Sequence, residues 1–97
     1  MGLFFGNKTS LGYRRSAELA NTILKKRGTP STGAAALLNM MSDGVTAAHL
    51  CGEEAEQAAL YLREIAPRLS RADRADALAI AEDAKHASDS GGGWDIG

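Results

Sequence analysis

The sequence predicts a mostly α fold: a compact bundle of about four helices with an irregular or short-strand N-terminal segment and a Gly-rich, Trp-bearing tail. Alanine, which has the highest helix propensity, fills 18 of the 97 positions, whereas Val, Ile and Thr, which are rarer in helices, fill ten. The net charge of −1 lacks the self-repulsion that usually accompanies disorder. We therefore expect a single folded domain over residues 1–97, with its helical core at 13–87.

The first segment, residues 1–12, mixes apolar side chains with three glycines and an asparagine. This composition predicts an extended chain with turns and a short strand near its start. A helix is expected from Tyr13 or Ser16 to Arg27, because the glycine that follows is a common C-terminal stop. Its buried face is predicted to contain Leu19, Ala20, Ile23 and Leu24.

The second expected helix opens with Pro30 and either Ser31 or Thr32, residue types that are favoured at helix starts. It runs through an apolar stretch to Ser42, where a Ser-Asp-Gly turn follows. Its apolar face is predicted to contain Ala34, Leu37, Leu38 and Met41, widened by Ala36 and Met40. Such a wide apolar surface predicts a nearly central helix.

A histidine, a cysteine and three glutamates fall within eight residues, where the third helix is expected to begin. These residues are His49, Cys51, Glu53, Glu54 and Glu56. Glutamates in a first helical turn complement unpaired backbone N–H groups and the positive end of the helix dipole. Cys51 stands at the cap and Glu54 three residues later, which is the spacing of a capping box. We interpret the cluster as a helix start, followed by a buried stripe of Ala55, Ala58, Ala59, Leu62, Ile65 and Leu69.

The last helix is expected over about residues 71–87, with Ser70 as its cap and Asp73 three residues later. Its inward face is predicted to contain Ala77, Leu78, Ile80, Ala81 and Ala84. Residues 88–97 are expected to form a flexible tail, because three successive glycines cannot sustain a helix. Trp94 supplies an apolar anchor within this tail.

The cluster around Cys51 is also the strongest candidate for chemistry. A zinc site needs three or four converging ligands, yet the chain has no second cysteine, and its other histidine, His86, falls on another expected helix. A helix start can lower a thiol pKa, but one such thiol in a loop is a weak catalytic signal. The sequence therefore predicts no catalytic residue, no metal ligand and no cofactor, and we do not expect an enzyme.

Charge is divided unevenly along the chain. Residues 1–42 carry six basic groups and one acidic group, whereas residues 43–97 carry five basic and eleven acidic groups. The basic side chains of the first helix predict an edge that binds an acidic partner or nucleic acid: Arg14, Arg15, Lys25, Lys26 and Arg27. The alternative is structural, with these groups offsetting the negative end of their own helix and the two halves attracting one another.

Residues 36–50 give a second indication of nucleic-acid binding. Gly44 and Leu50 have the separation found in a helix-turn-helix between the turn glycine and a buried residue of the recognition helix. Other positions depart from the residue preferences of that motif, and the glutamates that follow would lie near phosphates. Trp94 also has two interpretations, since a tail Trp either packs back onto its own domain or docks onto a partner.

The second half of the chain, from "HLCGEEAEQAALYLREIAP" through "ADALAIAEDAKHASDSGGGWDIG", resembles small Ala- and Arg-rich proteins of unknown function from actinobacteria and their phages. Those proteins often close with a Gly-rich step and a Trp. The resemblance implies a bacterial or phage cytoplasmic protein and supplies no catalytic residue. The sequence departs from it at the helix cap, where Cys51 stands in place of the usual Ser.

These features predict a small non-enzymatic interaction or regulatory protein that binds another macromolecule. A protein partner is the first expectation, DNA binding through the basic first helix or residues 36–50 is the alternative, and assembly as a homodimer is left open. The single Cys51 cannot form an internal disulfide, and the N-terminal apolar run is too short for a membrane span. We therefore expect a cytoplasmic protein without a membrane partner.

Overall fold

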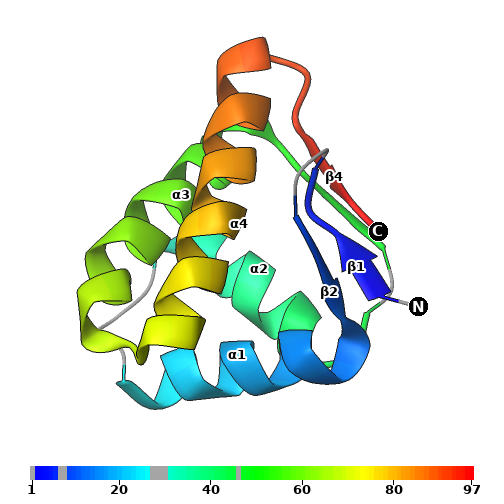
Figure 1. Cartoon of the computed structure of the whole chain (residues 1–97). Coiled ribbons are helices and arrows are strands. Elements are labelled where there is room, and N and C mark those ends of the chain that lie inside the picture. Colours follow the sequence, from blue (N-terminus) through cyan, green and yellow to red (C-terminus); the bar gives the residue numbers. More distant parts are fainter. Residues whose placement is uncertain (1, 7–8, 27–30, 46) are drawn as a thin grey trace.

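The structure, a computed structural model, describes residues 2–6, 9–26, 31–45 and 47–97. Its elements are β1 (Gly2–Phe4), β2 (Ser10–Gly12), α1 (Tyr13–Lys26), α2 (Thr32–Ser42), β3 (Ala48–Leu50), α3 (Gly52–Ile65), the 3-10 turn η1 (Ala66–Arg68), α4 (Arg71–Ser90) and β4 (Trp94–Ile96). The expected mostly α bundle of four helices is confirmed, with short strands near the N-terminus and a C-terminal strand that bears Trp94 (Figure 1).

The helices form the larger part of the molecule. α3 and α4 are joined by η1 and pack side by side, α1 crosses beneath them, and α2 packs against both α1 and α3 (Figure 1). Apolar side chains from the helices and from the N-terminal segment meet in one core. The largest of those that are fully buried are Phe5, Leu3, Leu19, Ile23, Leu37, Leu38, Met41, Leu62 and Ile80. Alanines such as Ala58, Ala77 and Ala81 are fully buried as well, and their small size lets backbones approach closely.

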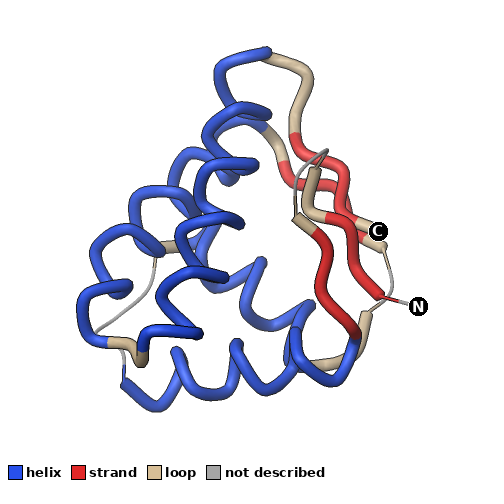
Figure 2. The backbone as a smooth tube through the Cα atoms, in the orientation of Figure 1, coloured by secondary structure: helices blue, strands red, loops and turns tan. Residues whose placement is uncertain are grey.

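The four strands gather on one side of the bundle, where the two ends of the chain lie close together (Figure 2). β1 pairs antiparallel with β2, and β3 pairs antiparallel with β4. The backbone N–H of Gly97 donates to the carbonyl oxygen of Phe4 at 3.0 Å, which joins the two pairs. The N-terminal and C-terminal segments are thereby tied to each other on the same side of α4.

The helix starts follow the capping signals in the sequence. The hydroxyl of Ser31 accepts the backbone N–H of Ala34 at 3.4 Å, and the hydroxyl of Ser70 accepts that of Asp73 at 3.3 Å. Both hydrogen bonds satisfy donors that a helix leaves unpaired in its first turn. Pro30, which was expected to open the second helix, lies outside the described residues.

Two features of α4 differ from expectation. The helix continues past Ala87 to Ser90, because the residue that ends it is Gly91, in the left-handed conformation with φ 77°. An ion pair of 2.9 Å between Lys85 and Asp89, one turn apart, supports the added turn. Leu78 was predicted to point inward but is 42% exposed, since it lies about 100° around the helix from the buried Ala77.

The last ten residues are not a free tail in this structure. Residues 88–90 belong to α4, and β4 then pairs with β3 across the register Ala48 with Ile96 and Leu50 with Trp94. Trp94 and Ile96 are each 2% exposed. Burial of two large apolar side chains holds this segment on the domain, which the three preceding glycines alone did not predict.

Candidate functional site

Among the basic residues that were predicted to bind a partner, Arg15 is held by the protein itself. Its Nε and Nη2 donate to Asp76 Oδ2 at 3.0 and 2.8 Å, and Nη2 also donates to Asp73 Oδ1 at 2.6 Å. These hydrogen bonds, to Asp73 first and then to Asp76, raise the pKa of Arg15 above its ordinary value. The predicted attraction between the basic and acidic halves is real at this contact, and it stabilises the crossing of α1 and α4.

The other basic residues of α1 are dispersed. Arg14 and Lys25 are exposed, and Lys26 Nζ donates to the carbonyl oxygen of Arg68 at 3.3 Å. Arg27 lies outside the described residues. With Arg15 committed to two aspartates, the basic edge that the structure describes is smaller than the sequence predicted.

Trp94, the remaining predicted partner-binding residue, packs into the domain. Its indole N–H donates to the carbonyl oxygen of Phe5, and the two rings lie 6.3 Å apart at 45°. A buried indole commonly finds such a hydrogen-bond acceptor while its ring contributes apolar area to the core. In this conformation Trp94 is not available as an exposed docking residue.

The cluster around Cys51 is a helix start, as interpreted from its spacing. The carboxylate of Glu54 accepts the backbone N–H of Cys51 at 3.0 Å, which completes a capping box. Hydrogen bonds from the Cys51 backbone and then from its side chain lower the pKa of Glu54, with a smaller contribution from His49. His49 turns away to Asp95 on β4, with Nδ1 and Oδ1 2.6 Å apart. Within the described part of the chain, no three His, Cys, Asp or Glu side chains converge as metal ligands.

Residues 36–50 do not fold as a helix-turn-helix. α2 ends at Ser42, residues 48–50 form the strand β3, and α3 begins only at Gly52. A helix-turn-helix joins its two helices by three or four residues, whereas nine residues separate these two. Leu50 therefore packs from a strand beside Trp94 and not from a recognition helix.

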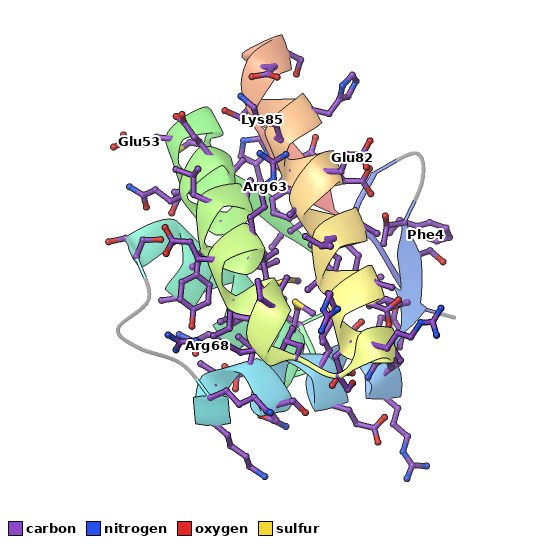
Figure 3. All side chains as sticks on the ribbon, turned by 60° about the vertical axis from the view of Figure 1, so that its left-hand side comes forward. Phe4, Glu53, Arg63, Arg68, Glu82 and Lys85 are labelled. Atoms are coloured by element: carbon purple, nitrogen blue, oxygen red, sulfur yellow. The ribbon has the colours of Figure 1, made fainter. Side chains whose placement is uncertain are left out.

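The structure instead brings together a site that the sequence did not indicate. A cleft of about 220 Å³ opens between the second half of α4 and the segment that follows β1, and it is lined by Phe5, Gly6, Glu82, Asp83, His86, Ala87 and Trp94. Its lining is mainly apolar, with two carboxylates and one imidazole from α4. In Figure 3, Glu82 projects from the flank of α4 that faces the N-terminal hairpin.

Asp83 is the unusual member of this cleft. The residue is only 9% exposed, and its Oδ2 atom is buried without a hydrogen-bond partner. Buried polar side-chain atoms are hydrogen-bonded in the large majority of cases, and leaving one unpaired costs roughly 1–3 kcal/mol. A donor that reaches the Asp83 carboxyl would therefore remove this cost.

Sequence reasoning missed this cleft, although one signal was present. Asp83 lies three residues after Ile80, at helical spacing within the stripe that was expected to be buried. A charged residue at a core-facing position marks either an internal partner or a functional site. The opposing wall, Phe5 and Gly6, lies far away in sequence and is placed only by the tertiary fold.

Comparisons of this chain with protein-family models, with curated proteins and with solved structures give no significant match. The described helices contain none that combines the length and the apolar character needed to span a bilayer.

Proposed function

We propose that this chain is a small non-enzymatic binding protein that holds one side chain of a protein partner in the cleft beside α4. The observation that carries this proposal is the unpaired oxygen of Asp83 in the cleft wall. A partner that donates to this carboxyl removes the free-energy penalty of burying it without a hydrogen bond, which gives the complex a source of affinity that the free protein lacks.

The size of the cleft supports a single inserted side chain. Cofactor and drug-sized pockets measure roughly 300–1,000 Å³. The volume here, about 220 Å³, is below that range and suits one long side chain better than a nucleotide or a folded peptide segment. The lining is mainly apolar, which supports the binding of a side chain with an alkyl stem.

A regulatory role requires only binding to a partner and no catalytic turnover. We also propose that the protein acts in the cytoplasm. The protein acts as a monomer or as a homodimer, and sedimentation velocity at several concentrations distinguishes the two. DNA binding has weaker support, because Arg15 is paired within the protein and the acidic cleft repels phosphates.

Selection from a displayed library of random peptides tests the proposal. We expect the wild-type protein to enrich a peptide family, and Ala87→Trp, which fills the cleft, to lose binding to it. Ala75→Trp adds the same indole to an exposed position of the same helix and serves as the matched control. Failure to enrich any family, or equal binding by both variants, would contradict the proposal.

A further inference from the structure

We infer that the cleft beside α4 is a binding site for a cationic side chain of the lysine or arginine type, with Asp83 as the carboxylate that receives the charge. This inference rests on the proposed function and names the partner group that the cleft selects. Its chemistry is an alkyl stem that ends in an ammonium or guanidinium group.

The electrostatics of the cleft favour a cation. Asp83 places a carboxyl group in one wall of the cleft, and the nearby Lys85 is already paired with Asp89 at 2.9 Å. No lysine or arginine is among the described residues that line the cleft. A hydrogen bond between an ionised donor and a carboxylate is roughly twice as strong as a neutral one, and low exposure reduces its screening by salt.

The geometry around Asp83 permits the contact. Gly6 stands directly opposite the carboxyl, and a Cβ atom added at Gly6 would lie 2.8 Å from Asp83 Cγ and 3.0 Å from Oδ1. Glycine at this position lets the backbone pack directly on the carboxyl, whereas any side chain here would collide with it. The terminal torsion of an Asp side chain is broad and roughly two-fold, so a modest rotation presents either oxygen to the cleft.

The remaining lining suits the stem of such a side chain. Phe5 and Trp94 form a tilted aromatic pair at the base, and Ala87 adds a methyl group on the α4 wall. Lysine and arginine bury their methylene stems against apolar surface while the charged head meets a polar group. An acidic side chain would be repelled by the carboxylate, and a neutral donor such as an amide or a hydroxyl would form a weaker hydrogen bond with it than an ammonium or guanidinium group does.

NMR titration with butylammonium chloride tests this assignment on the full chain. The amides of Phe5, Gly6, His86 and Ala87 and the indole N–H of Trp94 should shift and saturate in the millimolar range expected of so small a ligand. 1-Butanol and butyrate have a stem of similar length with a neutral or negative head, and both should bind at least about tenfold more weakly. Propylguanidinium distinguishes arginine from lysine as the preferred head.

Variants locate the charge. Asp83→Asn should weaken butylammonium binding by at least about tenfold, and Gly6→Ala, which crowds the same carboxyl, should weaken it as well. Asp43→Asn removes an exposed carboxylate outside the cleft and should leave the affinity unchanged. Lys8→Met removes the lysine nearest to Gly6 in the sequence. Because the cation comes from the ligand, this variant should bind butylammonium at least as tightly as the wild type does.

Three outcomes would overturn the inference: equal binding of butanol and butylammonium, insensitivity to Asp83→Asn, or shifts that lie outside the cleft. These are separable from failure of the proposed function. If the peptide selection enriches a family that Ala87→Trp abolishes but that lacks a basic residue, the binding protein stands and the cationic specificity is wrong. If butylammonium binds through Asp83 but no peptide is enriched, the site stands and the protein partner is wrong.

Discussion

The two halves of α4 use buried or half-buried aspartates in opposite ways. Near its start, the side chains of Asp73 and Asp76 are 17% and 32% exposed, and both are neutralised by Arg15 from α1. About two turns further on, Asp83 is more deeply buried, yet its Oδ2 has no partner. The fold thus supplies an internal cation to the more exposed aspartates and none from the described residues to the more buried one.

This difference indicates separate roles for the two regions. The first is a structural contact between segments 58 and 61 residues apart, and it fixes how α1 crosses α4. The second is a destabilising feature in a cleft wall, of the kind that proteins tolerate where a ligand completes the interaction.

Removing the indole that forms the base of the cleft should have the largest effect. Trp94→Ala is expected to lower the free energy of unfolding by about 3–5 kcal/mol, because it deletes a buried ring and the donor that pairs with the Phe5 carbonyl. Urea denaturation followed by circular dichroism measures the loss. Trp94→Phe, which retains a ring but not the N–H, should lose less. A loss below about 1 kcal/mol for Trp94→Ala would show that β4 is not part of the cooperative fold.

Breaking the paired region should have the next largest effect. Arg15→Gln is expected to lower the free energy of unfolding by about 1–2 kcal/mol, because it leaves two carboxylates without their cation. This range allows for the one-third exposure of the guanidinium. Arg14→Gln changes the exposed neighbour and should stay within about 0.5 kcal/mol. A double-mutant cycle with Asp76→Asn isolates the pair, and a coupling energy near zero would contradict the structural role.

Removing the unpaired carboxyl should act in the opposite direction. Asp83→Leu is expected to raise the free energy of unfolding by about 1 kcal/mol, because it replaces an unsatisfied buried group with an apolar one of similar size. Butylammonium binding should be lost in the same variant. Glu82→Leu on the exposed side of the cleft serves as the control for added apolar surface. Thermal melts that show Asp83→Leu to be less stable than the wild type would mean that the carboxyl is already satisfied.

The smallest effect concerns Glu54, a carboxylate that is satisfied by hydrogen bonds from Cys51. Because its folded pKa is depressed below the ordinary 4.5, its contribution is present above that value and is lost as the pH falls through the folded pKa. Glu54→Gln should therefore flatten the decline of stability below pH 4.5 relative to the wild type. Glu53→Gln changes the neighbouring glutamate, whereas the capping hydrogen bond to the Cys51 N–H is made by Glu54, so it should alter the acid limb less than Glu54→Gln. Identical acid limbs for Glu54→Gln and the wild type would contradict the capping role.

Local sequence signals predicted the helical elements well. The caps Ser31 and Ser70 and the box formed by Cys51 and Glu54 all act within three residues, so the relevant partners are close in the sequence. The buried stripe of α3, from Ala55 to Ile65, is confirmed for the same reason, since helical periodicity places one face inward wherever the neighbours are. Leu69 is buried as predicted, but it follows η1 and is not part of α3.

The candidate site was not predictable in this way. Its walls come from residues 5–6, 82–87 and 94, which share no local pattern and meet only after the two chain ends pair beside α4. Leu78 and Asp83 show the same limit within one helix. The apolar residue is exposed and the acid is buried, because the directions from which α3 and residues 5–6 approach decide which side of α4 is covered.

By itself, the sequence determined the helix count, the approximate ends of the helices and the residues that cap them, because helix propensity and capping are set by interactions over a few residues. Only the tertiary structure decided that Arg15 pairs with aspartates of α4, that Trp94 is buried, and that Asp83 lines a cleft without a partner. Those outcomes depend on contacts between segments that are dozens of residues apart. Such contacts follow from how the helices and strands pack against one another, which the order of residues within one element does not specify.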